Sequence, residues 1–232
     1  MISTLTKPHL HFVGIGGIGM SGIAQVFFNQ GYPVSGSDQS DGETLKKLSL
    51  MGIKTYVGHH ASQVEGASVV VISSAIRENN PEVQAAKKLR IPVIPRAEML
   101  GELMRGKVGI AIAGTHGKTT TTSLMATILS YAGLDPTIVI GGKVDALGGN
   151  AKWGSGAYVV AEADESDGSF LHLPTTFAVV TNIDSDHLDH FHTLSAIDDA
   201  FCGFIGALPF YGKAYVCGDD PGVKRCIPRF TK

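Results

Sequence analysis

The chain has 232 residues, of which 44% are hydrophobic, and its 19 Lys and Arg residues against 21 Asp and Glu residues give a net charge of -2. This near-neutral balance excludes the basic surface that nucleic-acid binding requires, and no apolar run is long enough to span a bilayer. We therefore expect a globular cytoplasmic protein, without a nucleic-acid or membrane partner, that holds any anionic ligand in a local site.

Apolar runs alternate with amphipathic segments in the first part of the chain, which is typical of βαβ units in a mostly parallel sheet. The pattern predicts strands at residues 9–15, 32–38, 53–58, 68–74 and 91–95. Helices are predicted between them, at residues 19–30, 42–51 and 80–90. Together these segments predict a compact doubly wound domain.

Pro92, Pro95 and a partly helical segment at 96–106 indicate a connector before a new strand begins at Val108. We therefore expect one domain over residues 1–100 and a second over residues 101–232. In the second domain the pattern predicts strands at 108–113, 136–142, 157–164, 176–184 and 213–219. Helices are predicted after the first of these strands and at residues 194–208, which again indicates an α/β sheet.

A glycine-rich turn follows the first predicted strand, where Gly14, Gly16 and Gly19 fill a G-x-G-x-x-G pattern. Such glycines allow a tight turn, close approach of the backbone to a diphosphate, and close packing of the helix on the strand. Asp38 ends the second predicted strand, where a carboxylate can meet a ribose hydroxyl. The pattern therefore predicts a diphosphate at the N-terminus of the next helix.

The turn by itself leaves the identity of its ligand open. A dinucleotide such as NAD, a nucleotide-sugar, and a tight turn without a ligand all agree with this pattern. Both ligands offer a diphosphate to a helix N-terminus. The first domain therefore fits an NAD-linked oxidoreductase as well as a protein that binds a nucleotide-sugar.

The stretch GTHGKT, Gly114–Thr119, separates a predicted strand from a predicted helix. Backbone N–H groups of such a loop cradle phosphate oxygens, Lys118 reaches the β/γ-phosphates, and the Thr119 hydroxyl binds Mg²⁺. The full phosphate-loop pattern has a glycine where this chain has Ile112. The run of threonines after Lys118 opposes helix propensity, which is typical of a site where hydroxyls satisfy free backbone donors. We therefore predict that this loop binds a nucleoside triphosphate.

Acidic and histidine side chains follow two later strands. The first group comprises Glu162, Asp164, Glu165 and Asp167, and the second comprises Asp184, Asp186, His187, Asp189, His190 and His192. Ligands of open α/β sheets bind outside the carboxyl ends of the strands, so both groups are expected to face the crevice of the phosphate loop. Mg²⁺ takes one or two carboxylates together with phosphates and water, which these groups can supply.

The second of these groups also has another interpretation. Histidine and aspartate side chains that lie close together are typical zinc ligands. The alternative is a nucleotide-bound Mg²⁺ with an unusual histidine ligand, a site that would tolerate Mn²⁺. The residues alone leave both kinds of metal site open.

Five further polar residues are expected to have no role in chemistry. Asp198 and Asp199 fall in the helix predicted at 194–208 and are expected on its solvent face. Cys202, Cys217 and Cys226 form no CxxC pair and are expected to be small buried hydrophobic residues in a reducing compartment.

These motifs together resemble those of the Mur ligase family of peptidoglycan synthesis. The segments that carry the resemblance run in family order along almost the whole chain: HFVGIGGIGMSGIA, VSGSD, VVISSAI, PRAEML, GTHGKTTTT, EADESDGSF and TNIDSDHLDHF. The resemblance implies an α/β chain with a Rossmann-like, UDP-sugar-binding domain over residues 1–100. It implies an incomplete P-loop-type ATP-binding domain over residues 101–232.

The resemblance also implies an ATP-dependent ligase with Mg²⁺ as cofactor. In such a reaction ATP phosphorylates the muramyl carboxylate of UDP-N-acetylmuramate, and the amine of L-alanine then attacks the acyl phosphate. A sister ligase that reattaches a recycled muramyl tripeptide shares the GTHGKT loop, but the GIGGIGMSG turn favours the alanine-adding branch. An NAD-linked oxidoreductase becomes the second choice, because it gives no reason for the loop or for the carboxylates beyond it.

The resemblance assigns the site residues as follows. The ATP site comprises Gly114, Thr115, His116, Gly117, Lys118, Thr119 and Thr120. The metal ligands are Thr119, Glu162 and His187, and the catalytic residues are Lys118, Glu162 and His187. The UDP-sugar site comprises Gly14, Gly16, Gly17, Ile18, Gly19, Met20, Ser37, Asp38, Ser73 and Ser74. Asn182 belongs to the same motif as His187, without an assigned role.

Mur ligases carry a third, C-terminal domain that binds the amino acid, and part of their adenine pocket comes from later sequence than this chain contains. We therefore expect the chain to bind the UDP-sugar, to bind ATP weakly, and to be inactive alone. Nothing in the sequence indicates an oligomeric state.

Overall fold

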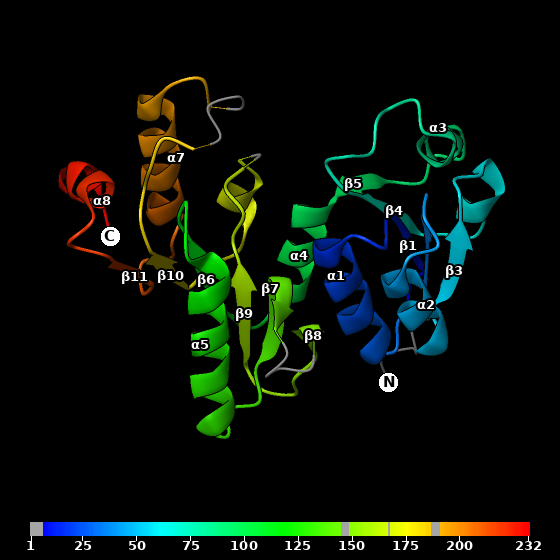
Figure 1. Cartoon of the computed structure of the whole chain (residues 1–232), viewed down its shortest axis with the longest axis horizontal. Helices are drawn as coiled ribbons and strands as arrows, with labels where there is room; N and C mark the ends of the chain where they lie inside the picture. Colours follow the sequence, from blue (N-terminus) through cyan, green and yellow to red (C-terminus); the bar gives the residue numbers. More distant parts are fainter. Residues whose placement is uncertain (1–6, 145–148, 167, 187–190) are drawn as a thin grey trace. The chain divides into compact units, whose positions relative to one another are not determined.

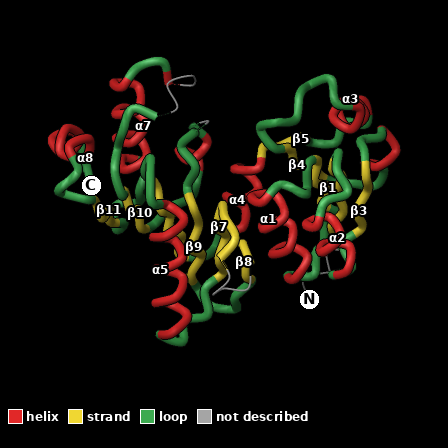
Figure 2. The backbone as a smooth tube through the Cα atoms, in the orientation of Figure 1, coloured by secondary structure: helices red, strands yellow, loops and turns green. Residues whose placement is uncertain are grey.

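The computed structural model describes residues 7–144, 149–166, 168–186 and 191–232. The chain divides into two compact units, Met1–Met99 and Leu100–Lys232, and the division falls inside the helix α4 (Arg96–Met104) (Figure 1). Each unit has its own sheet with helices around it, which Figure 2 shows as two separate sets of strands. The predicted α/β fold class is confirmed.

The first unit contains a five-stranded parallel sheet in the order β3-β2-β1-β4-β5. Its strands are β1 (Leu10–Val13), β2 (Val34–Asp38), β3 (Lys54–Val57), β4 (Val69–Ile72) and β5 (Val93–Pro95). Its helices are α1 (Ile18–Asn29), α2 (Glu43–Leu50), α3 (Pro81–Lys88) and the 3-10 helix η1 (Ala61–Val64). Because the strand order reverses at β1, the turns after β1 and β4 lie where sheets of this kind bind ligands.

The second unit contains a six-stranded sheet in the order β11-β10-β6-β9-β7-β8, parallel except for the antiparallel pair β7–β8. Its strands are β6 (Val108–Ala113), β7 (Thr137–Val144), β8 (Gly149–Lys152), β9 (Tyr158–Glu162), β10 (Phe177–Val180) and β11 (Lys213–Val216). Its helices are α5 (Lys118–Tyr131), α7 (Leu194–Gly206), α8 (Pro221–Cys226) and the 3-10 helices η3 (Ser169–His172) and η4 (Ile227–Arg229).

All the strands and helices that the sequence predicts are present. The sequence analysis missed β8, whose residues GNAK have no apolar run and form an edge strand beside β7. It also missed α8, which is only six residues long and is capped by Asp220, whose side chain accepts from the Val223 N–H. Both are short elements defined by their neighbours and caps, which a periodicity of apolar residues does not detect.

Helix α5 lies along one face of the sheet in the second unit, across β6, β9 and β7 (Figure 1). Ile112 of β6 and Val160 of β9 are buried in a cluster against which Met125 and Leu129 of α5 pack. This apolar contact fixes α5, and with it the loop that leads from β6 into the helix. Within the described residues, no helix is both long and apolar enough to cross a membrane.

Two expectations about polar side chains in the second unit are wrong. Asp198 is only 6% exposed and accepts two hydrogen bonds from the Arg225 guanidinium, each at 2.7 Å. Its side chain therefore contacts α8 rather than solvent, because Arg225, 27 residues later in the chain, supplies a bidentate partner. Cys217 is exposed, whereas Cys226 is buried as expected, and burial raises the pKa of its thiol to about 12.

Candidate functional site

The loop between β6 and α5 depends on two glycines with positive φ. Gly114 has a φ of 129°, and a Cβ atom there would lie 2.1 Å from Thr181 Oγ1. Gly117 has a φ of 82° and is the N-cap residue of α5. Residues with side chains rarely adopt this backbone conformation. The loop thus leads directly to the N-terminus of α5, where free N–H groups and the helix dipole favour an anion.

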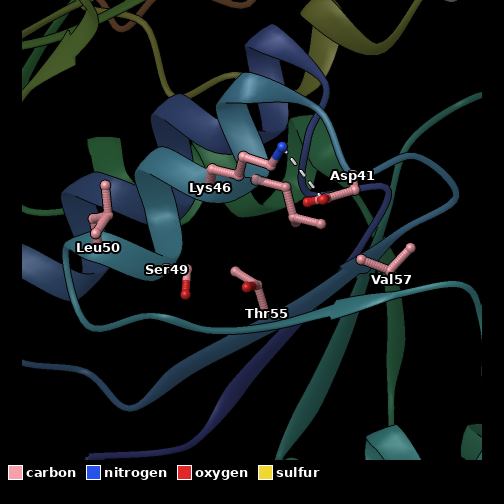
Figure 3. Close-up of a pocket in the computed structure, with 7 residues that line it drawn as sticks. Asp41, Lys46, Ser49, Leu50, Thr55 and Val57 are labelled. Carbon is pink, nitrogen blue, oxygen red and sulfur yellow. Dashed lines mark ion pairs between the residues drawn. The ribbon is translucent and has the colours of Figure 1, made fainter.

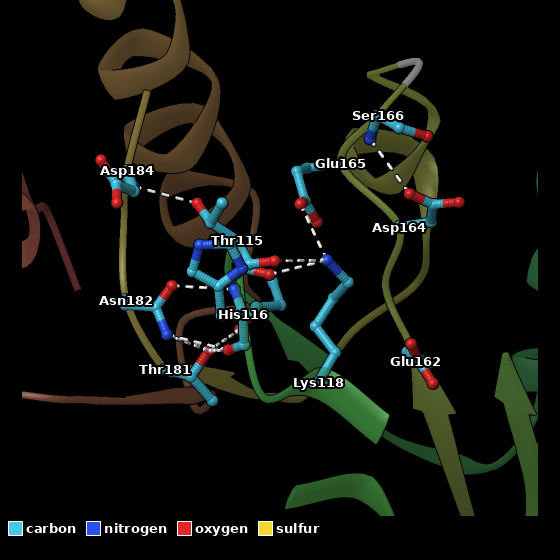
Figure 4. A network of polar contacts seen from close by, with 12 residues as sticks. Thr115, His116, Lys118, Glu162, Asp164, Glu165, Ser166, Thr181, Asn182 and Asp184 are labelled. Carbon is cyan, nitrogen blue, oxygen red and sulfur yellow. Dashed lines mark hydrogen bonds and ion pairs between the residues drawn. The ribbon is translucent and has the colours of Figure 1, made fainter. Parts of the chain in front are cut away.

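Asn182, which follows β10, fixes the middle of this loop by hydrogen bonds to His116 (Figure 4). The His116 N–H donates to Asn182 Oδ1, and Asn182 Nδ2 donates to the His116 carbonyl, both at 2.8 Å. Thr181 Oγ1 donates to the same carbonyl at 2.6 Å. The structure thus gives Asn182 the role that sequence reasoning missed, which is to bind the loop to the end of β10.

Lys118 is the first residue of α5, and oxygen atoms surround its ammonium group (Figure 4). Nζ donates to the carbonyls of Gly114 and Thr115 at 2.8 and 3.3 Å, and to Glu165 Oε1 at 2.8 Å. The side chains of Lys118 and Glu165 are 14% and 3% exposed, so the ion pair is largely shielded from water. A phosphate oxygen could replace the carboxylate in this arrangement, since both are anionic acceptors.

Thr119 and Glu162 meet where β9 ends. Thr119 Oγ1 donates to the two carboxylate oxygens of Glu162 at 3.1 and 3.2 Å, and the Gly141 N–H donates to Oε2 at 2.8 Å. A Cβ at Gly141 would lie 3.1 Å from Glu162 Oε1, so glycine lets β7 approach the carboxylate closely. A hydroxyl beside a carboxylate provides the oxygen ligands that Mg²⁺ prefers. Thr120, also predicted for the ATP site, is exposed.

The remaining predicted metal ligands comprise the half-buried Asp164, exposed residues, and residues that the structure does not describe. Asp164 Oδ1 accepts from the Ser166 N–H at 3.1 Å. Asp184, Asp186 and His192 are exposed, and the Asp184 N–H donates to Thr115 Oγ1 at 2.9 Å. Among the described residues, no group of three or more His, Cys, Asp or Glu side chains could hold a metal ion. The residues outside the described ranges are Asp167, His187, Asp189 and His190. The histidine ligand and the zinc alternative therefore stay predictions.

The glycine-rich turn of the first unit joins β1 to α1 and contacts the end of β2. The N–H groups of Gly14 and Ile15 donate to the Ser37 carbonyl at 2.8 and 2.9 Å. The Gly16 N–H donates to Asp38 Oδ2 at 2.9 Å. The structure therefore brings Asp38 to the turn, and it engages one of the N–H groups that a diphosphate could otherwise use.

Close packing explains the glycines on either side of this contact. A Cβ at Gly16 would lie 2.7 Å from Asp38 Oδ2, and one at Gly19 would lie 3.2 Å from Arg96 Nη1. Arg96 is thus a positive charge beside the start of α1. Arg96 falls within the motif PRAEML, where the sequence alone gives it no role. Its positive charge, which suits a diphosphate ligand, was the signal that could have indicated one.

The other predicted residues of this site differ in exposure. Ile18 is 44% exposed at the start of α1, whereas Met20 is 2% exposed and lies in the core. Ser37 is buried, so it contacts the turn through its carbonyl rather than its hydroxyl. Ser73 lies beside the turn, with Oγ 3.3 Å from a Cβ built at Gly14, and Ser74 is exposed. Gly17 is the N-cap residue of α1.

A hollow of about 330 Å³ lies elsewhere in the first unit, between α2 and β3 (Figure 3). Its lining comprises Asp41, Leu45, Lys46, Ser49, Leu50, Thr55 and Val57. Lys46 and Asp41 form an ion pair across it at 3.4 Å. None of the residues predicted to bind a ligand lines this hollow, so the glycine-rich turn stays the candidate site of the first unit.

Two models of known protein families match the chain in succession. "Mur ligase family, catalytic domain" matches residues 9–108, and "Mur ligase middle domain" matches residues 112–232. The chain belongs to the Mur ligase family. The matches to this family cover both glycine-rich turns, and they confirm the resemblance that the motifs predict.

Curated relatives of this Mur ligase chain are named UDP-N-acetylmuramate--L-alanine ligase. The relative from Chromobacterium violaceum is 60% identical over 225 residues, which are 97% of this chain and 48% of that protein. The relative from Methylibium petroleiphilum is 58% identical over 225 residues, with the same two coverages. The chain spans about half the length of the curated relatives it matches.

Solved structures of Mur ligases share the fold of this chain. UDP-N-acetylmuramate-alanine ligase MurC from Thermotoga maritima matches with a TM-score of 0.86 and 32% identity, over 94% of this chain and 51% of that one. UDP-N-acetylmuramate:L-alanyl-gamma-D-glutamyl-meso-diaminopimelate ligase from Neisseria meningitides matches with a TM-score of 0.88 and 31% identity, over 96% and 75%. The two Mur ligase branches are therefore equally close in fold.

Proposed function

We propose that this chain is the nucleotide-binding part of a cytoplasmic, ATP-dependent ligase that joins L-alanine to UDP-N-acetylmuramate through an acyl phosphate. The observation that carries the proposal is the loop at the start of α5, with the Lys118 ammonium on one side and the Thr119–Glu162 pair on the other. Strong similarity to relatives named UDP-N-acetylmuramate--L-alanine ligase supports the choice of substrates.

ATP is proposed to bind with its phosphates at the loop Gly114–Thr119. Phosphorylation of a carboxylate brings negative charges together, so a fixed cation must stabilise the charge that builds up in the transition state. Lys118 supplies that cation once a phosphate oxygen replaces Glu165 at Nζ. Asn182 keeps the loop in register by binding both backbone groups of His116. Positioning of this kind is the main contribution that a protein makes to phosphoryl transfer.

Mg²⁺ is proposed as the cofactor of this site, with Mn²⁺ tolerated. The donor set fits the ion, because Thr119 Oγ1 lies 3.1 Å from Glu162 Oε1 and both are oxygen ligands. Thr119 and Glu162 would hold the metal, and His187 is proposed as a further ligand from the motif alone. When bound, the metal neutralises charge on the phosphate oxygens.

The glycine-rich turn of the first unit is proposed to bind the UDP part of UDP-N-acetylmuramate. The N-terminus of α1 favours the diphosphate, and Arg96 beside Gly19 adds a positive charge. Asp38, whose Oδ2 accepts from the Gly16 N–H and whose Oδ1 accepts from Ser40, would bind a ribose hydroxyl in exchange for the Ser40 hydroxyl at 3.3 Å. Residues 1–100 would thus form the UDP-sugar-binding domain, and residues 101–232 the first part of the ATP-binding domain.

The recycling ligase is the second candidate, because a structure of that branch matches the chain as well as MurC does. The curated relatives, at 58% and 60% identity, favour L-alanine as the amino-acid substrate. An NAD-linked oxidoreductase gains no support, since it requires neither the loop before α5 nor the Thr119–Glu162 pair.

Calorimetric titration of the purified chain with UDP-N-acetylmuramate, with NADH in a parallel titration, tests the proposal. We expect heat of binding for the sugar nucleotide alone. Binding of NADH alone would contradict the proposed function and would indicate that the first turn belongs to an NAD-linked oxidoreductase. The chain is also expected to release no phosphate when ATP, Mg²⁺, UDP-N-acetylmuramate and L-alanine are supplied together, and measurable L-alanine-dependent release would contradict its inactivity alone.

A further inference from the structure

A buried polar network lies beneath the glycine-rich turn of the first unit, and Ser37 is its one member that the assignments above place in the UDP-sugar site. Its centre is Glu82 in the first turn of α3, whose side chain is 0% exposed. The Glu82 carboxylate contacts His11 Nε2 at 2.5 Å and His59 Nδ1 at 2.6 Å, and it accepts from Ser37 Oγ at 2.7 Å. One carboxylate therefore connects α3 with β1, β2 and the segment after β3.

The network continues from His11 to the surface through Ser35 and His9. His11 Nδ1 contacts Ser35 Oγ at 2.7 Å, Ser35 Oγ contacts His9 Nε2 at 2.8 Å, and His9 Nδ1 contacts the Gly66 carbonyl at 3.2 Å. With the His11–Glu82 contact, this row of side chains contains four contacts, and each needs one hydrogen to be a hydrogen bond. The carbonyl and an ionised carboxylate at its two ends are acceptors only.

A count of hydrogens shows how many protons the two histidines of this row of contacts must carry. Ser35 has one hydroxyl hydrogen, so the two imidazoles must supply the other three if all four contacts are hydrogen bonds. One imidazole then carries two N–H groups and a positive charge. Burial is the largest influence on His9 and lowers its pKa, while the hydrogen bond to the Gly66 carbonyl acts in the opposite direction. The shared hydrogen bonds therefore place one positive charge in the same buried network as the Glu82 carboxylate.

The charge on Glu82 follows from its surroundings. Burial by itself raises the pKa of the Glu82 carboxyl, but hydrogen bonds from His11, Ser37 and His59 outweigh it and hold the pKa below the ordinary value of 4.5. The cationic side chain that acts on the outer end of the network is Lys54 of β3, which also lowers the pKa of His9. Glu82 is therefore an ionised acceptor at neutral pH.

The network reaches the turn through Ser37. The Ser37 hydroxyl is held by Glu82, while its carbonyl accepts from the Gly14 and Ile15 N–H groups at 2.8 and 2.9 Å. The next residue, Asp38, accepts from the Gly16 N–H. The end of β2 therefore transmits the position of Glu82 to three successive N–H groups of the turn.

We propose that Glu82 is a positioning residue for the diphosphate-binding turn, which holds Ser37, and through it the turn and the Asp38 carboxylate, in the geometry that receives the nucleotide-sugar. The inference rests on the proposed function of the turn. It adds a residue that lies outside every motif assigned to ligand binding, on a helix that contains none of the residues assigned to the UDP-sugar site.

The first test needs no ligand and uses amide hydrogen exchange in the whole chain. Glu82→Gln keeps the side-chain shape but removes its charge. Ser37→Ala removes the direct hydrogen bond from β2 to Glu82, together with the Ser37–His59 contact, while it leaves Glu82 bonded to both histidines. Both variants are expected to speed exchange of the Gly14, Ile15 and Gly16 amides about tenfold. Glu78→Gln, an exposed change ahead of α3, is the control and is expected to leave these amides unchanged. Unaltered exchange in both test variants would overturn the proposal, whatever the turn binds.

The second test measures the dissociation constant of UDP-N-acetylmuramate by calorimetry. Glu82→Gln and Ser37→Ala are each expected to raise it about tenfold, and the double variant is expected to show little further loss, because both changes break one path. Additive losses would overturn the proposal, since general destabilisation would act on each background alike. If Glu82→Gln does not fold, the Ser37→Ala variant decides the test, and an unchanged dissociation constant in that variant would overturn the proposal. If the wild-type chain binds no UDP-N-acetylmuramate, the proposed ligand is wrong, and the exchange test still decides the role of Glu82.

The pH profile of binding separates positioning from a merely structural role. In the wild-type chain, affinity for UDP-N-acetylmuramate is expected to fall on the acid side as Glu82 becomes protonated and releases Ser37. Glu82→Gln is expected to reduce this acid limb, while Glu78→Gln keeps it in full. An acid limb of the same size in Glu82→Gln and in the wild-type chain would overturn the proposal.

Discussion

The two glycine-rich turns of this chain solve the same problem in different ways. Each follows a central parallel strand, opens a helix, and contains a glycine with positive φ, at Gly14 and at Gly114. In the first turn, a carboxylate on the neighbouring strand takes the Gly16 N–H, at 2.9 Å. In the second, an amide side chain takes the His116 N–H, and the cation, Lys118, is the first residue of the helix itself. Backbone geometry is therefore shared, and the side chains around it differ.

This difference teaches what each turn can do. The first turn has a fixed acceptor, Asp38, and a nearby cation, Arg96, which suits recognition of a diphosphate and its sugar. The second has a cation on the helix, Lys118, and the paired oxygen ligands of Thr119 and Glu162, which suit charge neutralisation during phosphoryl transfer. Recognition and chemistry are thus assigned to separate loops, and substitutions should separate them.

The largest effect is expected from a glycine that distinguishes the second turn. Gly114→Ala places a Cβ 2.1 Å from Thr181 Oγ1 in a backbone conformation with φ 129°, and is expected to lower the free energy of unfolding by about 3 kcal/mol. Gly117→Ala is the matched control, because its φ is 82° but no atom lies within 4 Å of the new Cβ. It is expected to cost about 1 kcal/mol in the same urea titration. An equal loss in the free energy of unfolding of the two variants would show that close packing at Gly114 is unimportant.

Lys118→Ala is expected to weaken binding of ATP with Mg²⁺ about a hundredfold, because the loop loses its cation. Affinity for UDP-N-acetylmuramate is expected to stay within a factor of about two, since the first turn is separate. Lys213→Ala, an exposed lysine of β11, provides the control. Calorimetry with each ligand makes the measurement, and a similar loss for both ligands in Lys118→Ala would break the comparison.

Asn182→Ala tests whether the second turn needs its amide support. The change removes two hydrogen bonds to His116 and is expected to lower ATP affinity about tenfold, with UDP-N-acetylmuramate unaffected. Thr181→Val removes the hydroxyl bond to the same carbonyl, together with longer contacts to the Ala113 carbonyl and Asn182 Nδ2, both at 3.3 Å, and is expected to have a smaller effect. If Thr181→Val were the more damaging of the two, the role given to Asn182 would be wrong.

The smallest effect is expected from a polar pair outside both turns. Hydrogen bonds from Arg225 lower the pKa of Asp198 below the ordinary value of 3.8. A lowered pKa means that the pair stabilises the fold above that value and loses its contribution as the pH falls through the folded-state pKa. Asp198→Asn is expected to cost about 1 kcal/mol at pH 7 and progressively less toward pH 2, with both ligand affinities unchanged. Thermal unfolding across this range, with the exposed Asp199→Asn as control, makes the measurement; a pH-independent cost would contradict the assignment.

The fold was predictable because its evidence is local in the sequence. Apolar residues predict the buried strand β6, and the glycine spacing of GTHGKT predicts the loop after it. The edge strand β8, by contrast, is defined by its partner β7, and Asp198 is buried by Arg225, which comes 27 residues later. Pairings of this kind depend on tertiary contacts that no spacing rule contains.

The candidate site was predictable to the same degree. Lys118, Thr119 and Glu162 follow from motif chemistry, and the structure brings them together. The partners that hold them, Glu165 for Lys118 and Asn182 for the loop, could not be chosen among several neighbouring polar residues. Glu82 gave no signal at all, because a single glutamate at the start of an amphipathic helix is usually solvent-exposed.

The central claim is that two separate turns bind two separate ligands, and a crossed titration tests it most directly. Lys118→Ala and Gly16→Ala, whose new Cβ would lie 2.7 Å from Asp38 Oδ2, are each titrated with ATP plus Mg²⁺ and with UDP-N-acetylmuramate. We predict that Lys118→Ala loses affinity for ATP alone and that Gly16→Ala loses affinity for UDP-N-acetylmuramate alone. Loss of both ligands in either folded variant would contradict the account.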